Sequence, residues 1–334
     1  MKILKQVLIF LLVLSMLILD TGCSPSTKQD TKNQLTIGIA FETLQTEYWV
    51  ASYKLFQSEC SDNKIKMLEA VANGDANRQF EQIRNFISRK VNGIIVVPKD
   101  GNTVIPMIKA ANKAGIPIVC YNRPPSKSDA KSVSVIADNY KLTYETVNFL
   151  ISKALQKKSK IKAMILVGDL GDINAIERRN GFEDAVSKFK DNIEIVARIP
   201  TEWNNEKAKA GIANALQAHP DVDLIFTSSD LHLPAIASSL KEIGRYKKSS
   251  EDGHVILGSF DGDATAYKMI LDGYLDAVGV QDVFFEVKSA VKAIMDLNEN
   301  KECDEIIRDP GLVVTQENIE TMKSKMWGAI LVNK

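Results

Sequence analysis

The feature that most constrains the fold is a repeated alternation of short, apolar, β-rich runs with longer stretches of helical apolar spacing. Apolar runs of about four to eight residues between helices are typical of right-handed β–α–β units, which build a parallel sheet. In the first half, the expected strands are Leu35–Phe41, Ile65–Glu69, Gly93–Val97 and Ile116–Tyr121. The expected helices there are Tyr48–Ser61, Asn77–Lys90 and Thr103–Ala114.

The same alternation restarts after Asp138 and continues to the end of the chain. The expected strands are Ile161–Val167, Glu194–Ile199, Leu224–Thr227, Val255–Ser259, Leu275–Val280 and Gly311–Thr315. The expected helices are Tyr140–Gln156, Ile176–Lys190, Glu206–Ala218, Leu233–Ile243, Ala264–Leu271 and Phe284–Asn298. A chain of 334 residues exceeds the usual size of one domain. Two arrays of similar size therefore predict two similar α/β lobes.

Residues 1–22 have the pattern of a signal peptide. Lys2 and Lys5 give a positive start, and Val7–Leu19 is an apolar run of 13 residues broken only by Ser15. A membrane-spanning helix needs about 20 apolar residues, so this run is too short to cross a bilayer. Its length and its basic start fit a secretory signal, which predicts an exported protein.

The signal ends in Thr21-Gly22-Cys23, and small residues before a cysteine resemble a bacterial lipoprotein processing site. We expect lipidation at Cys23 and attachment to the outer face of the cell membrane through that lipid. Asp20 stands where the pattern wants an apolar residue, so an ordinary secretory signal is the alternative. Residues 23–34 are polar and predict a flexible linker between the lipid and the folded part.

Composition excludes several classes of partner and site. Lys plus Arg equals Asp plus Glu at 42 each, so no charge excess predicts binding to nucleic acid. Cys60, Cys120 and Cys303 are widely spaced, which indicates packed side chains rather than a disulfide framework or a metal site. The three histidines, His219, His232 and His254, also lack metal-ligand spacing.

No nucleophile elbow, Walker loop or dinucleotide fingerprint occurs in the sequence. Gly168 and Gly171 bracket a loop without completing such a fingerprint, and we interpret them as turn glycines. We therefore expect no catalytic residues, no metal and no cofactor.

Open parallel sheets bind ligands beyond the carboxyl ends of their strands. The residues that follow the expected strands combine aromatic rings with amides, carboxylates and an arginine. They are Trp49, Asn122, Arg123, Asp172, Asn174, Trp203, Asp261 and Gln281. Aromatic faces suit the apolar faces of a sugar ring, and planar polar groups suit its hydroxyls. Because Trp49 and Trp203 lie in opposite halves, the pattern predicts a two-sided clamp for a sugar.

Each of these residues also has a purely structural interpretation. Either tryptophan could serve as packing bulk on its own lobe. Arg123 and Asp261 could form a structural ion pair across the lobes. Asp138-Asn139 opens a helix and is more typical of an N-cap than of a ligand contact, and capping is a rival role for Asp172 and Asn174.

Four short motifs carry a resemblance to a known family: Ile37-Gly38-Ile39-Ala40, Tyr121-Asn122-Arg123, Arg179-Asn180-Gly181-Phe182 and Gly258-Ser259-Phe260-Asp261-Gly262. In this order and spacing they resemble the periplasmic sugar-binding proteins of ABC transporters, of the type that binds ribose, galactose or xylose. The resemblance covers roughly residues 35–320. Glu47-Tyr48-Trp49 and Asp172-Ile173-Asn174 are most similar to the xylose-binding branch.

The resemblance implies two Rossmann-like lobes joined by a three-crossing hinge that closes around one monosaccharide. It places residues 35–137 and 282–310 in the amino-terminal lobe, and residues 138–281 and 311–334 in the other. It also gives sugar contacts to the eight residues named above.

The sequence departs from the family pattern at three positions. Ser229 stands where the family usually has Asn, Ile176 where many members have a basic contact, and Val97 where ribose binders have a polar group. These departures argue against plain ribose specificity.

Three functions compete for this pattern. The favoured one is the binding component of an ABC transporter, which delivers a xylose-like pentose or a related sugar to a membrane permease. The alternative is a sugar-sensing subunit that presents its ligand to a membrane histidine kinase or chemoreceptor. An enzyme or an intracellular regulator on the same scaffold is opposed by the missing catalytic motifs and by the export signal.

Overall fold

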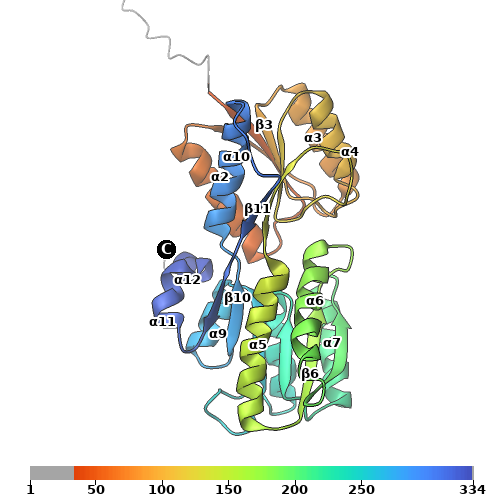
Figure 1. The fold of residues 1–334 in the computed structure, drawn as a ribbon, viewed down its shortest axis with the longest axis vertical. Coiled ribbons are helices and arrows are strands. Elements are labelled where there is room, and N and C mark those ends of the chain that lie inside the picture. Colours follow the sequence, from red (N-terminus) through yellow and green to blue (C-terminus); the bar gives the residue numbers. More distant parts are fainter. Residues whose placement is uncertain (1–33, 333–334) are drawn as a thin grey trace, which may run out of the picture. The chain divides into compact units, whose positions relative to one another are not determined.

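A computed structural model describes residues 34–332, and the folded unit begins at Leu35. Two six-stranded sheets form its framework, with the strand orders β11-β5-β4-β3-β1-β2 and β12-β10-β9-β8-β6-β7 (Figure 1). All neighbours are parallel except β12, which runs antiparallel to β10. The chain passes from one sheet to the other three times, and the predicted α/β fold with two parallel-sheet lobes is confirmed.

The strands of the first sheet are β1 (Thr36–Phe41), β2 (Lys66–Val71), β3 (Gly93–Val96), β4 (Ile118–Tyr121), β5 (Val133–Ala137) and β11 (Ile306–Asp309). Its helices are α2 (Glu47–Asp62), α3 (Ala76–Ser88), α4 (Ile105–Lys113) and α10 (Val283–Asn298). We call this sheet with these helices the first lobe.

The strands of the second sheet are β6 (Ile161–Val167), β7 (Ile193–Pro200), β8 (Leu224–Thr227), β9 (Ile256–Asp261), β10 (Ala277–Val280) and β12 (Leu312–Thr315). Its helices are α5 (Asn139–Lys157), α6 (Ile173–Ser187), α7 (Asn205–Ala218), α8 (Leu233–Glu242), α9 (Ala264–Leu271), α11 (Ile319–Met322) and α12 (Trp327–Val332). We call this sheet with these helices the second lobe.

Both faces of each sheet are buried, which explains why the strands are almost continuously apolar. Successive side chains of a strand point to opposite faces. On β3, Ile94 packs in the cluster formed with α3 and α4, whereas Ile95 belongs to the cluster that includes α2 and α10. On β6, Ile165 packs with α5 and α6, and Leu166 packs with α7 and α8. Helices therefore cover the two faces of each sheet, as Figure 1 also shows.

The structure corrects the predicted elements at four places. Strands β5 and β11 were not predicted, because Ser134 interrupts one short run and the other is an edge strand with exposed residues. Helix α6 begins at Ile173 rather than Ile176, since Asp172 is its N-cap. Two short helices, α11 and α12, follow β12, which was expected to close the chain.

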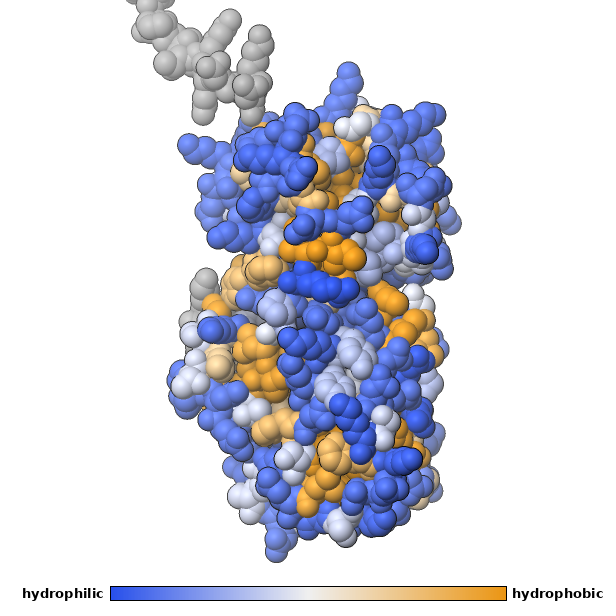
Figure 2. Space-filling view, viewed as in Figure 1, coloured by the Kyte–Doolittle hydropathy of each residue, from blue (hydrophilic) through white to orange (hydrophobic). Residues whose placement is uncertain are grey.

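The face drawn in Figure 2 is mostly hydrophilic, with small apolar patches between the polar residues. Between residues 34 and 332, no helix has both the length and the apolar character that crossing a bilayer would require. The predicted signal peptide, residues 1–22, and Cys23 lie outside the described residues.

Candidate functional site

A cavity of about 540 Å³ lies where the carboxyl ends of strands from both lobes meet. All eight residues predicted to contact a ligand line it. Asn122 and Arg123 follow β4, Asp172 and Asn174 begin α6, and Gln281 follows β10. The other residues that line the cavity include Glu42, Tyr48, Asp169, Arg178, Glu202, Asn205, Ser229 and Leu231.

Arg123 is held by two carboxylates, one from each lobe. Its Nε lies 2.7 Å from Asp172 Oδ2, and its Nη1 contacts Glu42. The guanidinium also lies 5.4 Å from the ring centre of Trp49. Burial disfavours the charged form, but Asp172 and Glu42 outweigh it and raise the pKa of Arg123. The alternative that Arg123 forms an ion pair with Asp261 is therefore wrong.

Asp261 pairs instead with Arg178, a residue that the sequence analysis did not select. Arg178 Nη1 lies 3.0 Å from Asp261 Oδ1, and its Nε donates to Asn139 Oδ1 at 2.8 Å. The guanidinium lies 3.7 Å from the centre of the Phe260 ring. Ile176 is not among the residues that line the cavity, whereas Arg178, two positions further along α6, is. Its spacing of four residues from Asn174, on one face of a helix, is the signal that could have revealed it.

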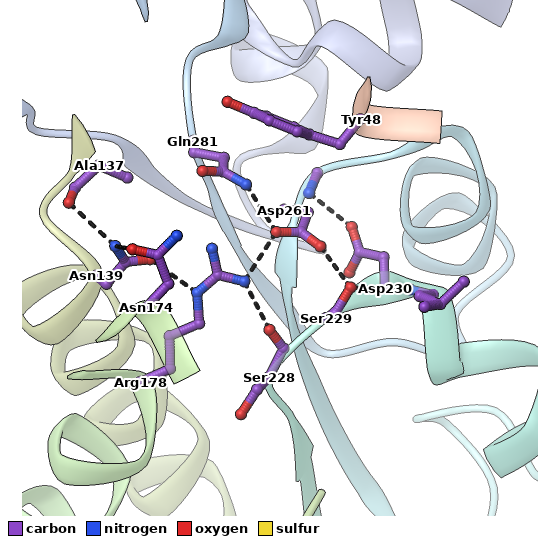
Figure 3. A network of polar contacts seen from close by, with 12 residues as sticks. Tyr48, Ala137, Asn139, Asn174, Arg178, Ser228, Ser229, Asp230, Asp261 and Gln281 are labelled. Atoms are coloured by element: carbon purple, nitrogen blue, oxygen red, sulfur yellow. Dashed lines mark hydrogen bonds and ion pairs between the residues drawn. The ribbon is translucent and has the colours of Figure 1, made fainter. Parts of the chain in front are cut away.

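A directional chain of hydrogen bonds connects Arg178 to Asp261 through four side-chain amides, and Figure 3 shows its two ends, from Arg178 to Asn139 and from Gln281 to Asp261. Each amide accepts a hydrogen bond from the residue before it and donates to the residue after it. The order is Arg178, Asn139, Asn174, Asn122, Gln281 and Asp261, with distances of 2.8, 3.1, 2.9, 3.0 and 2.8 Å. The direct ion pair closes the ring. Because all donors in the ring point in the same direction, the orientation of each side-chain amide is fixed. Flipping one amide would place two acceptors against each other on one side and two donors against each other on the other side.

Only Asn122 in this ring comes from the first lobe, and it is strained. Its φ is +66°, a left-handed value that asparagine tolerates better than most residues. Its backbone carbonyl oxygen also accepts a hydrogen bond from Asn174 Nδ2, at 3.0 Å. Asn122 therefore binds the first lobe to the second through both its side chain and its backbone.

Asp172 combines the structural and the site roles that the sequence left as rivals. One carboxylate oxygen caps α6 by accepting the Asn174 N–H at 3.0 Å. The other lies 2.7 Å from Arg123 Nε and accepts the indole N–H of Trp203 at 3.2 Å. Asp138 is the N-cap of α5, as predicted, whereas Asn139, which the same prediction covered, joins the ring of amides.

Trp49 and Trp203 differ in how they reach the cavity. Trp49 is 5% exposed and packs in the core of the first lobe, and it also lines the cavity, so packing and a place at the site occur together in this residue. Trp203 is half-buried and has a φ of +56°. Its ring lies on Gly168, where an added Cβ would be 2.1 Å from the indole. Gly168 is therefore a contact surface for Trp203 and not merely a turn glycine.

Asp261 sits in a dense set of hydrogen bonds. Ser229 Oγ donates to its Oδ2 at 2.6 Å, and Gln281 donates to its Oδ1. Burial raises the pKa of Asp261, while Arg178 and Ser229 act in the opposite direction. Ser229, where the resemblance leads us to expect Asn, thus acts as a hydrogen-bond partner of this carboxylate.

Beneath the cavity, a buried polar cluster was missed by the sequence analysis. Tyr48 donates to Glu286 Oε2 at 2.6 Å and lies 3.2 Å from the hydroxyl of Tyr121. Asn122 Nδ2 also donates to the Tyr48 hydroxyl at 3.1 Å. Burial raises the pKa of Glu286 well above its ordinary value, and Asp309 adds to the rise. Glu286 could not be found from sequence, because it lies inside a helix with no motif around it.

His232 and Cys60 are buried in the protein and have structural roles. His232 Nε2 lies 2.9 Å from Thr201 Oγ1, and burial lowers its pKa to about 4. Burial raises the pKa of the Cys60 thiol to about 11. Between residues 34 and 332, no three His, Cys, Asp or Glu side chains gather in a way that could hold a metal ion.

A scan against protein-family models matches residues 37–302 to the periplasmic binding protein domain. The chain belongs to the periplasmic binding protein family. Members of this family are exported solute-binding proteins and not enzymes.

Individual members match along most of their length. The ribose import binding protein of Bacillus subtilis is 26% identical over 324 residues, covering 94% of this chain and 100% of that protein. The D-xylose-binding periplasmic protein of Haemophilus influenzae is 25% identical, covering 81% of this chain and 79% of that protein. A solute-binding protein of an ABC transporter from Mycobacterium smegmatis, solved with bound glycerol, superposes with a TM-score of 0.79 at 26% identity, covering 87% and 97%. The xylose-binding branch is therefore one of several sugar-binding relatives.

Proposed function

We propose that this periplasmic binding protein captures one monosaccharide between its two lobes and delivers it to the permease of an ABC transporter. The observation that carries the proposal is the cavity itself. It is lined from both lobes by tryptophan rings, two arginines and several side-chain amides. Such groups fit a compact ligand that has apolar faces and many hydroxyls.

The charges in the cavity disfavour an anionic ligand. Arg123 is paired with Asp172 and Glu42, and Arg178 is paired with Asp261. Neither arginine is thus left to neutralise an anionic ligand. A sugar hydroxyl can instead accept from an arginine and donate to a carboxylate at the same time. We assign the ligand-contact role to the eight residues predicted from sequence and add Arg178.

A xylose-like pentose or a related sugar is the ligand class we propose. The two tryptophans would take the faces of the sugar, and the polar groups would take its ring of hydroxyls. The cavity lining includes Asp261, Asn122 and Gln281, which would accept hydrogen bonds from sugar hydroxyls or donate to them. Lobe boundaries at residues 137/138, 281/282 and 310/311 are part of the same proposal, and the three passages of the chain between the sheets support them.

A thermal-shift screen tests this proposal. The panel consists of D-ribose, D-xylose, D-allose, myo-inositol and furanose sugars, with glucose 6-phosphate as the charged control. A ligand present at 100 times its dissociation constant adds about 2.7 kcal/mol to the unfolding free energy. We expect at least one neutral member to stabilise the protein and the phosphate to leave it unchanged. A panel that leaves the protein unshifted at millimolar concentration would contradict the proposal.

We also propose that the mature chain begins at Cys23 and stays on the membrane through its lipid. The signal-like start and the small residues before Cys23 support this proposal. A Cys23→Ser variant should move from the membrane to the soluble exported fraction. Retention of that variant on the membrane would instead indicate an uncleaved signal.

A further inference from the structure

The turn that carries Asp261 has a backbone that needs external support. Asp261 has a φ of +119° and Gly262 a φ of +90°. Aspartate tolerates the left-handed region near a φ of about +60°, but a φ of +119° lies outside it and is typical of glycine, so the surrounding structure must hold this conformation. We call residues 261–264 the Asp261 turn.

On one side, the turn is held by a buried carboxylate. Asp230 Oδ2 accepts the backbone N–H groups of Gly262 at 2.6 Å and of Asp263 at 2.8 Å. Asp230 is 1% exposed and lies directly after Ser229, which itself donates to Asp261. These two hydrogen bonds fix the orientation of the backbone N–H groups of the turn.

On the other side, the turn is held by the beginning of α12. The indole N–H of Trp327 donates to the backbone carbonyl of Asp261 at 2.8 Å, and the Gly328 N–H donates to the carbonyl of Gly262 at 3.1 Å. The fit is close, because a Cβ on Gly328 would come within 2.2 Å of the Asp263 backbone. Trp327 is 1% exposed and does not line the cavity.

Trp327 also contacts the first lobe. Its ring meets the ring of Tyr48 edge-on, with 6.0 Å between the centres. The Tyr48 hydroxyl is bonded in turn to Glu286 and Asn122. A second contact between the lobes lies nearby, where Glu47 accepts the N–H of Ala264 at 3.2 Å. Trp327 therefore contacts both the Asp261 turn, through its indole N–H, and the first lobe, through its ring.

We infer that Trp327 is a positioning residue for ligand binding, which holds Asp261 in its strained conformation and does so most firmly when Tyr48 of the first lobe packs against it. The inference rests on the proposed binding of a sugar at Asp261. It adds a residue outside the cavity, from a segment near the end of the chain, to the groups that determine affinity.

The first test removes the indole donor and keeps an aromatic ring. In Trp327→Phe, the dissociation constant of the tightest sugar of the panel should rise about ten-fold, which corresponds to one hydrogen bond. Gly328→Ala should have a similar or larger effect, because its methyl group displaces the turn. Phe86→Leu, which alters a buried aromatic of the first lobe away from the cavity, is the control and should leave the dissociation constant unchanged.

A double-mutant cycle shows whether Trp327 acts through Asp261. In an Asp261→Asn background, the added effect of Trp327→Phe should fall below two-fold. An undiminished ten-fold effect in that background would contradict the inference. Equal losses of affinity in Trp327→Phe and Phe86→Leu would also contradict it, because they would indicate general destabilisation.

A measurement without any sugar separates this inference from the proposed function. Amide hydrogen exchange of Gly262 and Asp263 should quicken about ten-fold in Trp327→Phe, with the amides of β1 unchanged. If no sugar binds the parent protein, the proposed function fails, and this exchange pattern still decides the role of Trp327. Unchanged exchange in both residues would make Trp327 an ordinary core residue.

Discussion

Arg123 and Arg178 both lie in the cleft with a tryptophan and at least one carboxylate nearby, but their partners come from different parts of the chain. Arg178 contacts Asn139, Ser228 and Asp261, all within the second lobe. Arg123 contacts Glu42 in its own lobe and Asp172 in the other. We call these two sets of contacts the Arg178 centre and the Arg123 centre.

This difference indicates how the two halves of the site are made. The Arg178 centre is complete when the second lobe has folded, because every partner belongs to that lobe. The Arg123 centre is complete only when the two lobes meet. A ligand shifts a conformational equilibrium only by its differential affinity for the two states. A sugar that contacts both centres therefore binds the closed arrangement better than an open one.

The largest expected effect comes from breaking the Arg178 centre. Arg178→Met leaves Asp261 as a buried carboxylate without its cation, which should lower the unfolding free energy by about 3–5 kcal/mol and abolish sugar binding. Urea denaturation of the sugar-free protein measures it. Arg179→Met is the matched control, because the hydrogen bonds of the Arg179 guanidinium go to its neighbour Asn180. This variant should change the unfolding free energy by less than about 1 kcal/mol. Similar losses in both variants would contradict this account.

The two tryptophans should separate binding from folding. Trp203→Ala and Trp49→Ala should each weaken sugar binding by about 1–3 kcal/mol, because each removes an aromatic face from the ligand. Trp49→Ala should also lower the unfolding free energy by about 3 kcal/mol, since Trp49 is a core residue. Trp203→Ala should leave stability nearly unchanged. Calorimetric titration and urea denaturation of both variants provide the comparison, and unchanged affinity in either would assign that ring to packing alone.

Breaking the Arg123 centre should have a smaller effect on stability. In Arg123→Gln, Glu42 and Asp172 can be hydrated when the lobes separate, so the unfolding free energy should fall by only about 1 kcal/mol. Affinity for the sugar should still fall about ten-fold, because closure no longer gains this contact. Denaturation and calorimetry on the same preparation measure the two quantities. A loss of stability as large as that of Arg178→Met would remove the distinction between the two centres.

The smallest expected effect is a dependence of affinity on pH. Burial raises the pKa of Asp263 to about 7, and the carboxylates of Glu47 and Asp261 add to the rise. Glu47 belongs to the first lobe, so closure brings it near Asp263 and raises that pKa further. The closed state therefore binds the proton more tightly, and affinity should be about two-fold higher at pH 6 than at pH 8.

Asp263→Asn is the control for the pH effect. The amide can still cap α9, where Asp263 accepts the Ala266 N–H, but it carries no charge. Calorimetric titrations of this variant should show the same affinity at pH 6 and pH 8. A higher affinity at pH 8 in the parent protein would reverse the sign and contradict the argument.

Sequence patterns predicted the framework well where burial leaves a local trace. The buried strand Ile161–Val167 was predicted with the bounds that the structure shows, because an apolar run needs no distant partner to be noticed. The edge strand Ile306–Asp309 left no such trace, since its pairing with β5 comes from backbone hydrogen bonds and its side chains are largely exposed.

The candidate site shows the same contrast. Residues at or directly after strand ends, such as Asp261 and Asn122, could be selected because chain direction places them at one edge of a sheet. Arg178 lies inside a helix and gains its role from Asn139, Ser228 and Asp261, which are distant in sequence. Trp327 depends likewise on a contact with the Asp261 backbone, 66 positions away. Such roles depend on tertiary contacts that a single sequence does not display.

Solution scattering of the protein with and without its tightest sugar tests the central claim most directly. If the sugar bridges the Arg178 centre and the Arg123 centre, the radius of gyration should decrease when the sugar is added. Asp261→Ala should remove most of this decrease, because the hydroxyls and Arg178 lose a buried acceptor. A sugar that binds tightly and leaves the scattering curve of the parent protein unchanged would contradict closure around the ligand.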